Sequence, residues 1–225
     1  MSDGACYIVG GGPSLKEFDF QILLNQDVIA INQSIFKLPK AKYFITTDFT
    51  WLLKSGVLNS LDLGIRRKFT HHPSEKYFVL ALSPDRKTFI DEQHCIDKKF
   101  GLKYDLTLFD KIIHPTKYGG IGKTFEDFHY GSDSGYSALQ LAVVLGYTKI
   151  YLLGLDFTTS YGETHYHEDY SKKDPLDYQN KLDEFLTPYP EAFQILKERG
   201  ICVFSSSHIS QLNKYILYVN VGNIL

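Results

Sequence analysis

The chain has 225 residues, of which 44% are hydrophobic and 15% aromatic, and its formal net charge at pH 7 is −2. A single domain over residues 1–225 with a full core suits this length, and the near-neutral charge indicates no bulk attraction to nucleic acid or an anionic membrane. The 3 widely spaced cysteines argue against a disulfide framework or a zinc knuckle and fit a reducing cytosol. No apolar run reaches about 18 residues, and no basic segment leads into one at the N-terminus. We therefore expect a cytoplasmic protein without a signal peptide or a membrane span.

The first predicted element is an apolar strand over Tyr7–Val9 that runs directly into the turn Gly10-Gly11-Gly12-Pro13-Ser14. Glycine permits positive φ angles and leaves no Cβ in the way of a ligand, so backbone N–H groups of such a turn can point at a phosphate. The spacing matches neither the dinucleotide fingerprint nor the P-loop and predicts neither site. A tight strand-to-helix connection that binds nothing is an equal alternative.

Further short segments rich in β-branched or aromatic residues predict buried strands at Val28–Ile31, Tyr43–Thr46, Phe78–Leu82, Ile150–Leu153 and Ile201–Phe204. Helical spacing of apolar residues predicts helices over Ser134–Leu145 and Pro190–Arg199, each followed by a glycine and then by a strand. This alternation favours an α/β sandwich built on a mainly parallel sheet.

Two segments, about 84–130 and 158–187, lack this regular pattern. The first is charged and is interpreted as a lid or small inserted subdomain, with long loops and a peripheral hairpin as the safer alternative. The second is polar and aromatic, and a loop of that length in a compact domain is usually functional or disordered.

Polar residues stand at the ends of the predicted strands or at the start of the following helix. They are Asn32, Asp48, Asp156, Ser132 and the pair Ser134-Gly135. In an open α/β sheet, ligands bind beyond the carboxyl ends of the strands at a topological switch point, so we expect these residues to converge on one crevice. Taken singly, each one is better explained as an ordinary turn or helix cap.

A second group of polar residues lies in Thr164–Tyr170, where His165 and His167 point the same way if the segment is extended. Together with Asp169 they could bind a divalent metal, or one histidine could act as a general acid or base. A solvated loop is the third interpretation. No remote third ligand can be identified, so the acid/base interpretation is favoured over the metal site.

Several motifs resemble a known family: Gly10–Leu15, Ala30–Gln33, Ser134-Gly135 and Ala142–Phe157. In order and spacing they are similar to the bacterial sialyltransferases typified by the Campylobacter lipooligosaccharide enzymes. They are equally similar to the DUF115 group, which includes archaeal 6-hydroxymethylpterin diphosphokinases and many phage proteins. The segment Pro190–Asn213 resembles the phage branch of that group.

The resemblance implies a Rossmann-like three-layer sandwich with a mainly parallel sheet and a small lid or inserted segment, which holds CMP. It assigns nucleotide contacts to Gly10, Gly12, Ser14 and Asn32, and places Ser134-Gly135 beside the phosphate.

This sequence also departs from the sialyltransferase pattern. Gly11 and Asp48 stand where that family has asparagines, and Thr158 stands where it has a tyrosine that assists the departing phosphate. An aspartate at position 48 repels a phosphate unless a cation intervenes.

Three functions follow from these observations. The first is a glycosyltransferase that uses a CMP-sugar as donor substrate and a glycan or small molecule as acceptor, without a further cofactor. In it His165 or His167 would deprotonate the acceptor, and Tyr161 or Tyr166 would stabilise the leaving phosphate. The second is a diphosphokinase-like transferase with ATP and Mg²⁺, for which Asp48 and Asp156 are candidate metal ligands. The third is a non-catalytic nucleotide- or glycan-binding protein, and homo-oligomerisation stays open for all three.

Overall fold

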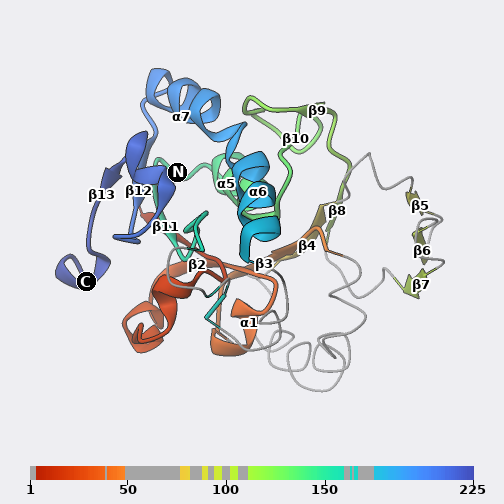
Figure 1. Cartoon of the computed structure of the whole chain (residues 1–225). Helices are drawn as coiled ribbons and strands as arrows, with labels where there is room; N and C mark the ends of the chain where they lie inside the picture. The colour runs from red at the N-terminus through yellow and green to blue at the C-terminus, as the bar shows by residue number, and fades with distance from the viewer. Residues whose placement is uncertain are drawn as a thin grey trace.

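The computed structural model describes residues 4–38, 40–48, 77–81, 88–90, 94–97, 102–105, 111–159, 163, 165–166 and 175–225. The strands of its main sheet are β1 (Ala5–Val9), β2 (Asp27–Ile31), β3 (Tyr43–Thr46), β4 (Tyr77–Ala81), β8 (Lys111–Ile113), β11 (Lys149–Leu153), β12 (Cys202–Ser205) and β13 (Leu217–Tyr218). These 8 strands lie in the order β13-β12-β11-β1-β2-β3-β4-β8, and every neighbouring pair is parallel (Figure 1). The predicted α/β fold with a mainly parallel sheet is thereby confirmed.

All six strands predicted from sequence belong to this sheet, with bounds that differ by at most two residues. The two additional strands, β8 and β13, form the two edges of the sheet. β13 is only 2 residues long, and both are exposed although they lie in the apolar run Tyr215–Val219.

The order of the strands reverses at β1. The chain proceeds from β1 outward through β2, β3, β4 and β8, then returns to place β11 on the other side of β1. The register pairs Val9 with Leu153, so β1 and β11 end side by side. Loops that leave two such strands in opposite directions open a crevice beyond their carboxyl ends, as in other doubly wound sheets.

Helices cover both faces of the sheet (Figure 1). The α-helices are α1 (Ser34–Lys37), α5 (Ser134–Val144), α6 (Pro175–Leu186) and α7 (Tyr189–Glu198), and the 3₁₀ turns are η1 (Pro13–Leu15), η2 (Phe20–Leu23), η7 (Gln211–Lys214) and η8 (Val221–Asn223). Figure 1 shows α5 and α7 on one side of the sheet and α1 on the other. α5 is almost entirely buried, because both its apolar face and its small residues pack in the core. Among the described residues, each helix is too short or too polar to cross a bilayer.

The two irregular segments contain more secondary structure than their patterns predict. Within 84–130, β5 (Thr88–Ile90), β6 (His94–Asp97) and β7 (Leu102–Asp105) form a separate antiparallel sheet, while β9 (Lys117–Tyr118) pairs with β10 (His129–Tyr130). Within 158–187, helix α6 occupies a stretch for which a loop was expected. Its signal is present in the sequence, since Tyr178, Leu182 and Leu186 recur every four residues after Pro175.

Candidate functional site

A pocket of about 280 Å³ opens where the order of the strands reverses, beyond the carboxyl ends of β1, β2, β3 and β11. We call it the switch-point pocket; its walls are the loops after these strands, the start of α5, one face of α6 and His165. Of the residues predicted from sequence to form a site, it brings together Gly10, Gly11, Gly12, Pro13, Asn32, Asp48, Ser132, Ser134, Gly135, Asp156 and His165.

The remaining predicted residues lie elsewhere. Ser14 and Tyr166 are described but do not line the pocket. Tyr161 and His167 lie outside the described residues, so their predicted roles stay predictions.

The glycine turn packs tightly against the loop that follows β11. The Gly10 N–H donates to the Leu153 carbonyl and the Gly12 N–H to the Gly154 carbonyl, both at 2.8 Å. A Cβ on Gly10 would lie 2.6 Å from the Gly154 oxygen, so the close approach of the two loops requires glycine there. The expectation that these two N–H groups face a phosphate is not met, because protein carbonyls already accept them. Among the described residues the Gly11 N–H has no acceptor, which leaves it for a ligand.

Asp156 closes the other side of the same turn. Its carboxylate, buried at the end of the β11 loop, accepts hydrogen bonds from the Ser14 N–H at 2.8 Å and from the Ser14 hydroxyl at 2.7 Å. This negative group therefore occupies the place at the start of η1 where an anion was expected. Ser14 donates to Asp156 and does not itself line the pocket, so its contact with a nucleotide stays a prediction.

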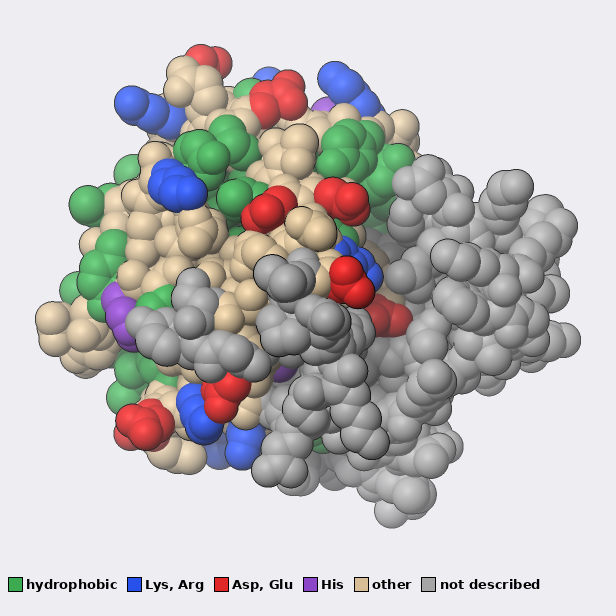
Figure 2. All heavy atoms as spheres, in the orientation of Figure 1, with side chains coloured by type: hydrophobic (Ala, Val, Ile, Leu, Met, Phe, Trp, Pro, Cys, Tyr) green, Lys and Arg blue, Asp and Glu red, His purple; other side chains and the backbone are tan. Residues whose placement is uncertain are grey.

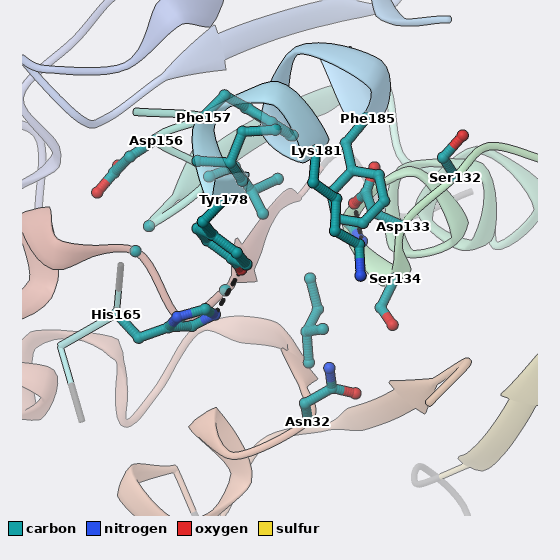
Figure 3. A pocket seen from close by; sticks show the side chains of 18 of the residues that line it. Asn32, Ser132, Asp133, Ser134, Asp156, Phe157, His165, Tyr178, Lys181 and Phe185 are labelled. Atoms are coloured by element: carbon teal, nitrogen blue, oxygen red, sulfur yellow. Dashed lines mark hydrogen bonds between the residues drawn. The ribbon is translucent and has the colours of Figure 1, made fainter. Parts of the chain in front are cut away.

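Asn32 is held in an unusual backbone conformation at the end of β2. Its φ angle is +50°, in the left-handed region that asparagine tolerates better than most residues. The Thr46 hydroxyl donates to its Oδ1 at 2.6 Å, and the buried Ser34 hydroxyl bridges the ends of β1 and β2 through Val9 and Ile31. The amide oxygen is therefore used. No described residue accepts from the amide nitrogen, whose two hydrogens are left for a ligand in the pocket (Figure 3).

The first turn of α5 is also occupied by a side chain of the protein. Asp133 caps the helix by accepting from the Gly135 N–H at 2.5 Å and the Tyr136 N–H at 3.1 Å, and the Tyr189 hydroxyl donates to it at 3.1 Å. Burial raises the pKa of Asp133 to about 6, so the carboxylate is mostly ionised at neutral pH. Its charge opposes an anion at this helix start.

The serines on either side of Asp133 also have protein partners. The Ser134 hydroxyl lies 2.7 Å from that of Thr47, and the Ser132 hydroxyl lies 3.1 Å from that of Tyr118. Ser134 is thereby tied to the end of β3, and Ser132 to β9 at the rim of the pocket.

His165 and Tyr178 meet inside the switch-point pocket (Figure 3). The His165 Nε2 and the Tyr178 hydroxyl are 3.4 Å apart, and the two ring centroids are 5.6 Å apart. Because Tyr178 is buried on α6, the pair positions an imidazole opposite the ends of β1 and β2. Imidazole is the side chain that most often serves as a general acid or base in enzymes.

Tyr166 has a different environment from the one its predicted role requires. Its N–H donates to the Gly11 carbonyl at 3.0 Å, and its ring packs against Phe20 with a centroid distance of 5.9 Å. Burial raises the pKa of its phenol to about 12. Among the described residues, the tyrosine that lines the pocket is Tyr178.

Helix α6 supplies a wall of the pocket that no predicted site residue anticipated. Tyr178, Lys181, Leu182 and Phe185 lie on its inner face. Asp177, Asp183 and Glu184 are exposed on the same helix, and Asp177 and Glu184 stand four residues before and three residues after Lys181. Figure 2 shows acidic side chains on the side of the molecule that carries α6. The helical spacing of apolar residues in Pro175–Leu186 is the sequence feature from which these pocket residues could have been predicted. Within the described ranges, no three histidine, cysteine or acidic side chains gather to ligate a metal.

No protein-family model matches the chain, and no curated protein matches it. Among solved structures, the sialyltransferase CstII from Campylobacter jejuni in complex with the substrate analogue CMP-3FNeuAc is similar, with 18% identity and a TM-score of 0.51 over 96% of this chain and 86% of that one. A complex of sialyltransferase CST-II with a trisaccharide acceptor and CMP has 21% identity and a TM-score of 0.42 over 96% and 87%. The first likeness supports the sialyltransferase resemblance at the level of the fold.

Proposed function

We propose that this chain is a nucleotide-sugar-dependent glycosyltransferase that takes a CMP-type donor and transfers its sugar to a hydroxyl group of a glycan or small molecule. The observation that carries the proposal is that His165 and the Asn32 amide line one pocket at the point where β1 and β11 diverge. His165 supplies a base on one wall of the pocket, and the Asn32 amide on another wall can hold a ligand. The shared fold with a structure that contains a CMP-sugar analogue favours cytidine over other nucleosides.

The pocket has the groups that such a donor needs. Its volume of about 280 Å³ is near the lower limit for small-molecule sites, which are usually about 300–1,000 Å³. The Asn32 NH₂ and the Gly11 N–H can both donate to ligand oxygens. Since Thr46 fixes the orientation of the Asn32 amide, its two hydrogens are presented to the pocket before a ligand arrives.

The transfer step follows from the position of His165. Nε2–H donates to the Tyr178 oxygen, so Nδ1 is the ring nitrogen that accepts the proton of the acceptor hydroxyl. The oxygen of that hydroxyl forms a bond to the anomeric carbon of the donor sugar. The bond between that carbon and the phosphate oxygen breaks, and CMP leaves with the electron pair. Tyr178 orients the imidazole through the contact between its hydroxyl and Nε2.

A thermal-shift screen of CMP, CDP, UDP, GDP and ATP, each with and without Mg²⁺, tests the proposal. We expect CMP to stabilise the protein, by about 2.7 kcal/mol at ~100 Kd, because a ligand that binds only the folded state shifts its unfolding. Asn32→Ala should remove the shift, whereas Asn180→Ala, a matched change at an exposed position of α6, should retain it. An absence of stabilisation by every nucleotide would contradict the proposal.

One observation favours the second candidate function, a diphosphokinase-like transferase with ATP and Mg²⁺. Asp48 lines the pocket, and a carboxylate near a phosphate usually needs a cation. If the donor binds without metal, Asp48→Asn removes a repulsive charge and should tighten CMP binding in EDTA about fivefold, or roughly 1 kcal/mol. If Asp48 holds Mg²⁺, the same change should weaken binding of Mg-ATP. Calorimetric titration of both ligands distinguishes the two functions.

A further inference from the structure

Two groups of backbone N–H donors that could hold a phosphate, at Ser14 and in the first turn of α5, are already taken by carboxylates of the chain. Asp156 accepts hydrogen bonds from the N–H and hydroxyl of Ser14 at the glycine turn, and Asp133 accepts from the Gly135 and Tyr136 N–H groups in the first turn of α5. Both carboxylates line the pocket, as does Asp48. An anionic ligand therefore meets three acidic side chains and needs a positive group from elsewhere.

Lys181 is placed to supply that charge. It lies on the inner face of α6 and projects into the pocket beside Phe185 (Figure 3). Its ammonium group lies 5.2 Å from the centroid of the Phe185 ring, a cation–π contact that limits the freedom of the side chain. Within the described part of the chain it makes no ion pair, so ligand binding need not break one.

We propose that Lys181 binds the phosphate group of the nucleotide donor, in place of the glycine turn and the start of α5. This inference rests on the proposed function, because it assumes that a nucleotide occupies the switch-point pocket. In this arrangement α6 recognises the charge of the phosphate, and the residues at the strand ends hold the uncharged nucleoside. A point charge that can move toward the phosphate suits a pocket in which the N–H groups of Ser14, Gly135 and Tyr136 are already bound to carboxylates.

Paired titrations with CMP and cytidine test this inference, since the two ligands differ only by the phosphate. We expect Lys181→Met to weaken CMP about tenfold or more and to leave cytidine within about twofold. Lys181→Arg keeps the charge and should retain most of the affinity for CMP. Lys197→Met, the same change at an exposed position of α7, is the matched control and should bind both ligands like the unmodified chain.

The outcomes separate this inference from the proposed function. Unchanged CMP affinity in Lys181→Met overturns the inference, while CMP binding by the unmodified chain leaves the proposed function standing. An equal loss of CMP and cytidine affinity also overturns it, because Lys181 would then support the shape of the pocket. If the unmodified chain binds neither ligand, the proposed function fails and the inference falls with it. Circular dichroism verifies that the substitutions of Lys181 and Lys197 leave the fold intact.

Discussion

Replacing His165 with glutamine should slow sugar transfer by about 10²- to 10⁴-fold, the usual contribution of a positioned general base. Glutamine keeps a polar side chain of similar reach next to Tyr178 but cannot accept a proton from an alcohol. Because the expected loss concerns the proton transfer, the affinity for CMP should stay within about twofold. Initial rates with a CMP-sugar donor, together with CMP titration, measure the two quantities separately.

The pH dependence adds a second readout for the same residue. The rate of the unmodified chain should fall toward acidic pH, where a protonated imidazole can no longer act as a base. The residual activity of His165→Gln should lack that decline. Tyr178→Phe removes the hydroxyl next to Nε2 and should reduce the rate less than His165→Gln, because it disturbs only the orientation of the base.

A matched change at His208 controls for the loss of a histidine as such. His208 is exposed and lies outside the switch-point pocket, so His208→Gln should leave the rate unchanged. Full activity of His165→Gln would contradict the assignment and make His167 the remaining candidate from the sequence. Binding of CMP without any transfer by the unmodified chain would favour a non-catalytic nucleotide-binding protein.

Much of this fold can be predicted from sequence because its strands are buried on both faces. A strand such as Ile150–Leu153 must be apolar throughout and end at a turn, and both features are visible in the residues. The convergence of Asn32, Asp48 and Asp156 follows from the same pattern, since the carboxyl ends of parallel strands share one edge.

The partners of individual donors cannot be predicted in this way. Nothing local to Gly10 or Ser14 indicates that a carbonyl and a carboxylate about 140 residues away accept their N–H groups. The composition of the α6 segment, which is rich in charged and aromatic residues, predicts a loop. Only the four-residue spacing of its apolar residues indicates a helix. The position of Lys181 in the pocket is therefore seen in the structure and does not follow from the composition of the segment.

Substituting alanine for Gly12 should destabilise the protein by about 4 kcal/mol, which for a chain of this size lowers Tm by about 10 °C. The new Cβ would overlap with the Asp156 carboxylate and lie 2.8 Å from the Gly154 carbonyl oxygen. Gly12 has a φ of −67°, which alanine adopts readily, so the cost comes from the overlap and not from backbone strain. Relieving the overlap requires Asp156 to move, which breaks its two hydrogen bonds to Ser14.

Gly4→Ala is the matched control, because a Cβ there meets no atom within 4 Å and should leave Tm unchanged. Thermal unfolding of both variants measures the difference directly. Because the Asp156 carboxylate is one of the overlapping groups, the double variant Gly12→Ala/Asp156→Ala should lose less stability than the sum of the single changes. Equal Tm values for Gly12→Ala and Gly4→Ala would show that the two loops can separate without cost. In that case the three glycines would no longer be explained by packing, and a ligand that approaches the turn closely would become the better explanation.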